Sequence, residues 1–155
     1  MENAFDPAVC IAFERDATQN FIDLLRREQR TLQQADVSEL VALTNEKTHQ
    51  VQQLAQLADA RNRWLATLGY TGDRSGVERV LHDCPAATGV WKELLQLAGM
   101  AAHLNKINGD LIDQRLRYNQ QALAVLQAAT PENSGLYGSD GQPRSFSGGR
   151  QLGEG

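Results

Sequence analysis

The segment from Val90 to Leu126 contains no proline and repeats apolar residues at helical spacing, so it constrains the fold more than any other stretch. Steps of four and three residues from Val90 trace one series of mostly apolar side chains, and the same steps from Trp91 trace a second series beside it. Two neighbouring seams predict a helix that packs against two neighbours. Such a helix would be about 55 Å long, which favours an elongated bundle over a small globule.

Both seams become polar at the same level of this helix. The first seam consists of Val90, Leu94, Leu97, Ala101, Leu104, Asn108, Leu111, Arg115, Tyr118, Ala122 and Val125. The second consists of Trp91, Leu95, Ala98, Ala102, Asn105, Gly109, Ile112, Leu116, Asn119, Leu123 and Leu126. Gly109 alone costs about 1 kcal/mol relative to alanine inside a helix. The polar residues and Gly109 at this level therefore indicate a constraint on the sequence other than helix stability.

Composition narrows the class of protein. The 155 residues carry a net charge of −4 with both signs interspersed, which gives no support to binding of nucleic acid or an anionic membrane. No apolar run is long enough to span a bilayer, and the N-terminus lacks the pattern of a secretory signal, so we expect a cytoplasmic protein. Cys10 and Cys84 are far apart with no ligand spacing, and we interpret both as small buried hydrophobes.

The remaining patterns predict an all-α fold, an antiparallel bundle of three long helices and one short helix. We expect helices near residues 7–35, 37–68, 75–83 and 86–129. Asp6 and Pro7 would open the first helix, and Gly69 would end the second. Capping boxes at residues 36–39 and 75–78 would open the second and third. At residue 36 the chain either kinks or turns, and we favour the turn.

The last 25 residues differ in character from the rest. Residues 131–155 contain seven glycines, four serines and two prolines, with few apolar side chains. Such a segment buries too little surface to offset its ordering entropy. The sequence therefore predicts a helical domain over residues 1–130, followed by a flexible tail.

No catalytic constellation stands out. His49, His82 and His103 lie on three different predicted helices without carboxylates or cysteines at ligand spacing. Phosphate-loop, nucleophile-elbow and zinc-protease motifs are all missing from the sequence. We therefore expect a protein that is not an enzyme and that uses no metal or cofactor.

A surface that binds helices is the alternative to an enzyme. The leucines of the long helix could form a groove for an amphipathic helix of a partner, or they could all be buried within the chain's own bundle. The other predicted helices are too short to cover two seams throughout. The part from Ile112 to Leu126 is the least covered, and exposed apolar surface of this kind marks an interaction site.

Several residues together resemble the FlgN family of flagellar export chaperones. The resemblance is carried by Leu104-Asn105-x-x-Asn108-Gly109-x-Leu111-Ile112 and by Leu136-Tyr137-Gly138-x-Asp140-Gly141 in the tail. The N-terminal half agrees with the family's leucine-rich helical hairpin through Leu25, Glu28, Leu32, Asp36, Leu40, Leu43, Lys47 and Leu54. Glu28 and Lys47 either pair across this hairpin or are two independent solvated charges.

The resemblance implies a function and its partners. A FlgN-type chaperone binds C-terminal helical segments of the hook-associated proteins FlgK and FlgL, prevents their premature association, and delivers them to the flagellar type III export gate. Its substrate groove would here comprise Leu104, Asn108, Leu111, Ile112, Leu116, Leu123 and Leu126. Tyr137 in the tail would contact the gate protein FlhA. A structural coiled-coil adaptor, or a bundle that self-assembles through its long helix, is the competing interpretation, and the sequence fixes no oligomeric state.

Overall fold

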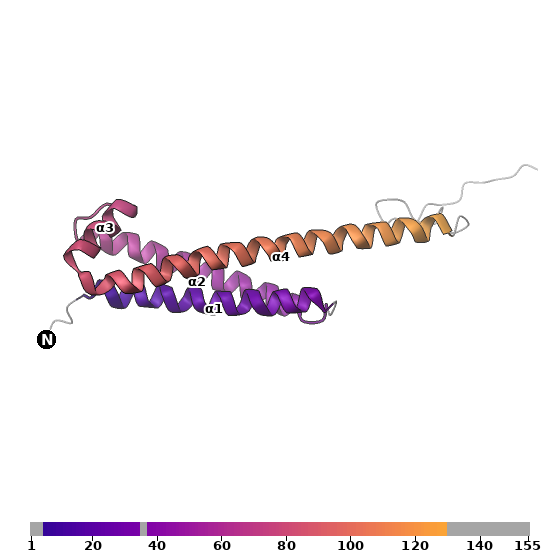
Figure 1. Cartoon of the computed structure of the whole chain (residues 1–155), viewed down its shortest axis with the longest axis horizontal. Helices are drawn as coiled ribbons and strands as arrows, with labels where there is room; N and C mark the ends of the chain where they lie inside the picture. The colour runs from indigo at the N-terminus through magenta and orange to yellow at the C-terminus, as the bar shows by residue number, and fades with distance from the viewer. Residues whose placement is uncertain (1–4, 35–36, 130–155) are drawn as a thin grey trace, which may run out of the picture. The chain divides into compact units, whose positions relative to one another are not determined.

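The fold is entirely helical in the computed structural model, which describes residues 5–34 and 37–129. Three long helices, α1 (Pro7–Gln33), α2 (Leu40–Thr67) and α4 (Thr88–Ala129), accompany the short helix α3 (Arg74–Asp83) (Figure 1). One turn of 3₁₀ helix, η1 (Pro85–Ala87), leads into α4. This confirms the predicted all-α class with three long helices and one short one.

The chain divides into two compact units, Met1–Ile112 and Asp113–Gly155, and α4 contributes to both. The first unit holds α1, α2, α3 and the N-terminal part of α4. The described part of the second is the C-terminal part of α4, up to Ala129. The predicted flexible tail over residues 131–155 lies outside the described residues, and so does Tyr137.

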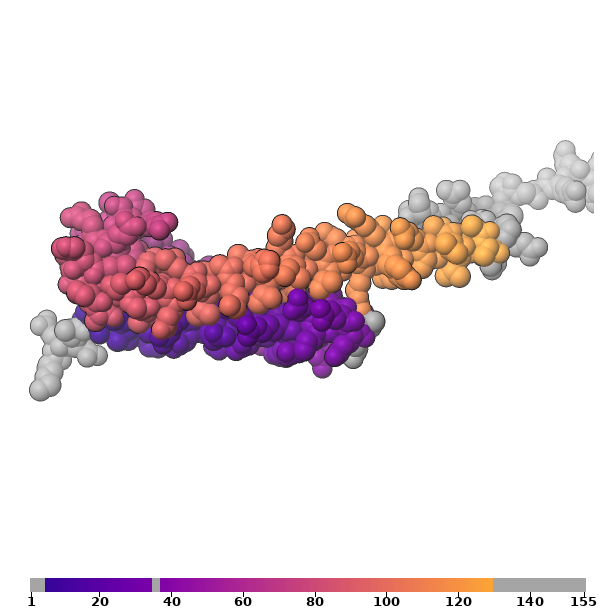
Figure 2. Space-filling view, viewed as in Figure 1, coloured from indigo at the N-terminus to yellow at the C-terminus, as the bar shows by residue number. Residues whose placement is uncertain are grey.

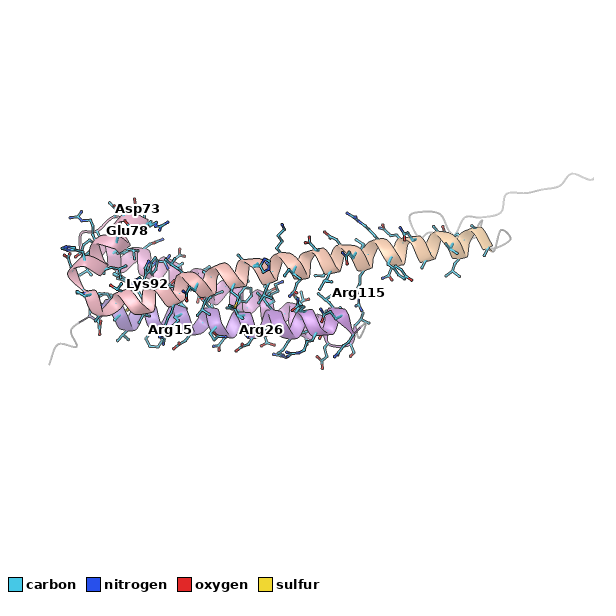
Figure 3. The ribbon with its side chains drawn as sticks, in the orientation of Figure 1. Arg15, Arg26, Asp73, Glu78, Lys92 and Arg115 are labelled. Atoms are coloured by element: carbon cyan, nitrogen blue, oxygen red, sulfur yellow. The ribbon has the colours of Figure 1, made fainter. Side chains whose placement is uncertain are left out.

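α1 and α2 form an antiparallel hairpin. The Glu14 carboxylate pairs with Arg61 towards one end of the hairpin, and Glu28 pairs with Lys47 towards the other. α2 thus runs back along α1, and residues 35–36, beside which we favoured a turn, lie outside the described residues. α4 runs parallel to α1, since Arg15 donates to Glu93 and Arg26 donates to the sulfur of Met100 further along. Figure 3 labels Arg15 and Arg26 along α1.

Local signals set most helix ends. The Asp6 carboxylate accepts a hydrogen bond from the backbone N–H of Ala8, and Pro7 occupies the first turn of α1, as predicted. Gly69 adopts a φ of 84° after α2, and the Tyr70 N–H donates to the Leu65 carbonyl at 2.8 Å. This left-handed glycine satisfies the last carbonyls of the helix, which confirms the predicted stop.

Both predicted capping boxes are wrong. α2 begins at Leu40 after Glu39, whose side chain makes no capping hydrogen bond, so Ser38 and Val37 belong to the preceding turn. α3 is capped by Asp73, which accepts from the Gly76 N–H at 3.0 Å. Asp73 precedes the serine that the pattern favoured, and its charged oxygen is the stronger acceptor for a helix N-terminus.

The core of the first unit forms three linked clusters. Phe21, Ile22, Leu24 and Leu25 of α1 pack with Leu43 of α2 and Ala101 of α4. Ile11 of α1 packs with Ala87 and Leu94, and Leu65 packs with Val77 and Val80 under α3. Side chains of α1 and the adjoining part of α4 abut along the face seen in Figure 2. Cys10 and Cys84 are half-buried free thiols rather than fully buried ones.

Candidate functional site

The two seams of α4 differ in their exposure to solvent. In the first seam, which we call the inner seam, every residue from Val90 to Arg115 is buried or half-buried. In the second, which we call the outer seam, every residue from Leu95 to Leu126 is exposed. Of the two alternatives for the leucines of the long helix, burial within the chain's own bundle therefore does not hold for the outer seam. Its physical cause is that α1 and α2 lie against one side of α4 only.

The seven predicted groove residues divide between the two seams. Leu104, Asn108 and Leu111 belong to the inner seam, and Leu104 packs against the core cluster that contains Phe21. The other four belong to the outer seam and are 44–62% exposed; they are Ile112, Leu116, Leu123 and Leu126. The expectation that the stretch from Ile112 to Leu126 is least covered is therefore confirmed.

Asn108 has a structural role in the bundle. It is completely buried, and its amide nitrogen donates to the Leu25 carbonyl at 2.8 Å and to a Glu28 carboxylate oxygen at 2.9 Å. Lys47 donates to the same oxygen at 3.0 Å. One buried carboxylate thus joins α1, α2 and α4 at a single level, which fixes the register of the three helices. Glu28 and Lys47 are therefore paired, not independent.

A second buried acid lies towards the other end of the hairpin. Glu14 pairs with Arg61, whose guanidinium also lies 5.5 Å above the Trp91 ring. Burial raises the pKa of Glu14, and the nearby Arg61 charge and its hydrogen bond oppose that rise. Because Arg61 and Glu14 neutralise each other, they add no net charge to this part of the surface.

An open groove of about 360 Å³ runs beside this pair, between α1, α2 and α4. Its lining is mostly apolar and includes Phe21, Leu54, Leu94, Leu95, Ala98 and Ala101, with Glu14 and Arg61 as its only charged residues. Leu95 and Ala98 are members of the outer seam. The outer seam therefore forms part of a recess within the first unit, of a kind that suits apolar side chains.

The C-terminal part of α4, in the second unit, exposes apolar residues of both seams. Tyr118 and Val125 of the inner seam are 74% and 67% exposed, beside Leu123 and Leu126 of the outer seam. The predicted groove omitted Tyr118 and Val125, although their helical spacing could have identified them. Residues 118–129 carry no charge, and Arg115 and Arg117 precede them. This segment is chemically an apolar helix surface with a basic border.

Residues 5–34 and 37–129 were also searched for metal sites, clustered histidines and membrane-spanning helices. That part of the chain contains no group of three or more potential metal ligands. His49, His82 and His103 are exposed on α2, α3 and α4, and His82 lies 3.5 Å from the neighbouring Asp83 with 90% of its side chain exposed. Among these same residues, no helix is long and apolar enough to cross a membrane.

Comparison with known proteins identifies the family. The family model described as FlgN protein matches residues 1–145. This chain belongs to the FlgN family. Among its relatives is the flagella synthesis protein FlgN of Proteus mirabilis, 30% identical over 110 residues, which covers 66% of this chain and 74% of the relative. The protein of the same name from Yersinia enterocolitica is 32% identical over 101 residues, covering 61% and 67%. No solved structure matches the chain.

Family membership indicates a role in flagellum synthesis. Against that background, the two surfaces of α4 have distinct meanings. The inner seam, with Asn108, packs within the bundle of the first unit, whereas the apolar residues near the C-terminal end of α4 are exposed.

Proposed function

We propose that this FlgN-family protein is a flagellar export chaperone that binds the C-terminal helical segments of FlgK and FlgL and delivers them to the export gate. The exposed apolar face at the C-terminal end of α4 is the observation that carries this proposal. Leu116, Leu123 and Leu126 lie on one side of the helix at intervals of seven and three residues. An amphipathic helix recognises such a row through its own apolar side chains.

The composition of the face suits reversible binding. Residues 118–129 carry no charge, so binding of a helix there would remove water from no charged side chain of this stretch. Asn119 interrupts the leucines, and a polar residue within an apolar seam selects one register at some cost in affinity. Ile112 extends the row, while Leu104, Asn108 and Leu111 support the helix from inside the first unit. Tyr137 remains our proposed contact with FlhA.

Titration calorimetry against C-terminal peptides of FlgK and FlgL tests this function. We expect saturable one-to-one binding by the full chain, and the same binding by a chain that ends at Thr130. The double variant Leu116→Asp/Leu123→Asp should bind at least about tenfold more weakly, because two charges would have to be desolvated in the complex.

The matched control is Gln114→Asp/Gln121→Asp, which adds the same charges at exposed positions outside both seams. This control should bind both peptides like the unmodified chain, and circular dichroism should report the same helix content for both variants. Unchanged binding by the folded Leu116→Asp/Leu123→Asp variant would show that the proposed face is not the substrate site.

A further inference from the structure

Two recesses of the first unit meet beside α2 and α4. The groove of about 360 Å³ described above is lined by Arg61, Trp91 and Leu95, and a second recess of about 300 Å³ is lined by the same three residues. The second recess continues towards the start of α3, where Gly72 and Val77 line it. Because the recesses share three residues, they form one continuous surface, which we call the α2–α4 groove.

The α2–α4 groove has an apolar end and a hydrogen-bonding end. Phe21, Leu54 and Ala101 line the apolar end, and all three belong to one core cluster or pack against it. Arg61 lies at the other end, with its guanidinium 5.5 Å from the centre of the Trp91 ring. Leu54 and Arg61 are seven residues apart on α2, so the two ends are separated by about 10 Å, or two turns of helix.

A groove of this length suits a short amphipathic helix. α4 contributes the small side chains of Ala98 and Ala101 to the lining, which leaves room for the backbone of a docked helix to approach. We propose that the α2–α4 groove binds an amphipathic helix of a partner protein, whose aliphatic side chains fill the apolar end and whose glutamine accepts a hydrogen bond from Arg61. None of the residues that line this groove belongs to the face proposed for FlgK and FlgL.

Arg61 has hydrogen-bond donors to spare. A guanidinium carries five N–H groups. Among the residues that the structure describes, only Glu14 accepts a hydrogen bond from Arg61, whose side chain is 22% exposed and lines both recesses. The remaining N–H groups are therefore available to a ligand in the groove. A purely apolar ligand would remove water from them without replacing its hydrogen bonds, which costs affinity.

The charges around the groove favour a neutral acceptor over a carboxylate. Both arginines that line it are already paired, Arg61 with Glu14 and Arg74 with Glu78. Asp73 adds a further negative charge at the second recess, where it caps α3. A carboxylate of the ligand would therefore be desolvated without an unpaired cation to compensate it. A side-chain amide offers an acceptor without a charge, and glutamine is a better helix former than asparagine.

A designed helical peptide serves as the probe. It has about 18 residues with blocked ends, leucines at i, i+3 and i+4 of one face, and lysine and glutamate on the other face. Glutamines at i−3 and i+7 allow the helix to dock in either direction. Titration calorimetry of the full chain should show saturable one-to-one binding. The fluorescence of Trp91 should change on binding in Trp64→Phe, which retains Trp91 as its only tryptophan.

Leu95→Asp and Val51→Asp locate the binding site. Both side chains are 46% exposed, but Leu95 lines both recesses and Val51 of α2 lines neither. Leu95→Asp should weaken binding of the probe at least about tenfold, and Val51→Asp should leave it within about twofold. The chain with Leu116→Asp/Leu123→Asp should bind the probe like the unmodified chain, whatever its affinity for the FlgK peptide. Circular dichroism should report the same helix content in all these chains.

Variants of the peptide examine the acceptor. With both glutamines replaced by methionine or by glutamate, the probe should bind the unmodified chain at least about fivefold more weakly. In Glu14→Gln the charge of Arg61 is no longer compensated, so the glutamate probe should bind more tightly than the glutamine probe. In Glu14→Gln/Arg61→Leu both charges are removed, and the glutamine and methionine probes should bind equally within about twofold.

Several results would overturn the proposal. The unmodified chain might not bind the glutamine probe saturably, Leu95→Asp might bind it undiminished, or the unmodified chain might bind the methionine probe equally well. Loss of binding in the folded Leu116→Asp/Leu123→Asp chain would place the peptide on the face proposed for FlgK instead. That face could fail its own test with FlgK peptides while the groove still binds the probe, so the two proposals are tested separately.

Discussion

Glu28 is the residue on which three helices converge, so the loss of one of its partners should be costly. In Lys47→Met the carboxylate would stay buried with Asn108 as its remaining side-chain partner. Breaking a fully buried pair costs about 3–5 kcal/mol, and because the Lys47 side chain is 24% exposed we expect about 2–3 kcal/mol. Urea unfolding measures this loss of stability.

The neighbouring Arg27–Glu46 pair is the matched control. It joins the same two helices, but its side chains are 50% and 42% exposed, so Arg27→Met should cost less than about 1 kcal/mol. The triple variant Glu28→Leu/Lys47→Met/Asn108→Leu removes all three side chains of this polar cluster together and should recover most of the lost stability. Equal costs for Lys47→Met and Arg27→Met would mean that burial of Glu28 has no energetic consequence.

Glu14 should make stability depend on pH in the opposite sense to an ordinary ion-paired acid. Its pKa in the folded chain is raised above 4.5 by burial, despite the opposing Arg61. The folded state therefore binds the proton more tightly than the unfolded state. Its stabilising contribution is fully present below pH 4.5 and is lost as pH rises through the raised pKa.

The variant Glu14→Gln isolates this contribution. Between pH 4.5 and neutrality, the unfolding free energy of the unmodified chain should fall with rising pH relative to that of Glu14→Gln, which cannot titrate. Urea unfolding of both chains at matched pH values measures the difference. A difference that grows in the opposite direction would mean that the attraction of Arg61 outweighs the burial of the carboxylate.

At the scale of an element, the start of α3 depends on one close approach. A Cβ atom at Gly76 would lie 1.7 Å from the Thr71 carbonyl oxygen, so Gly76→Ala must displace backbone. This clash should outweigh the helix preference of alanine and destabilise the chain by about 2 kcal/mol. Tryptophan fluorescence during urea unfolding reports this loss, since Trp64 and Trp91 pack against the cluster under α3.

Gly89→Ala provides the comparison for α3. Its Cβ atom would meet nothing within 4 Å on α4, so this substitution should be neutral or stabilising by up to about 1 kcal/mol. Equal stability of the Gly76→Ala and Gly89→Ala chains would show that the loop before α3 adjusts without cost.

The helices themselves were predictable because their apolar periods are long and their breaks carry Pro7 and Gly69. The start of α3 was not, because Asp73 and Ser75 are both good capping residues and the capping-box pattern pointed to the serine rather than to the aspartate that caps the helix. Periodicity also revealed both seams of α4. It could not tell which seam α1 and α2 cover, since that depends on the side from which the hairpin approaches. Asn108 therefore belonged to the predicted groove, although it is buried.

For the whole molecule, the proposed function predicts that substrate binding and folding can be separated. Leu116 and Leu123 are 56% and 58% exposed, so they contribute little to the stability of the folded chain. The double variant Leu116→Asp/Leu123→Asp should therefore change the free energy of unfolding by less than about 1 kcal/mol, although it weakens binding of the FlgK peptide.

Leu43→Asp is the contrasting variant, because Leu43 lies in the core of the first unit and is 2% exposed. It should destabilise the chain by about 3 kcal/mol or more, since a charge would be buried without a partner. Urea unfolding measures both variants. A Leu116→Asp/Leu123→Asp chain as unstable as the Leu43→Asp chain would mean that these two leucines belong to the folded core, and that any loss of peptide binding follows from unfolding.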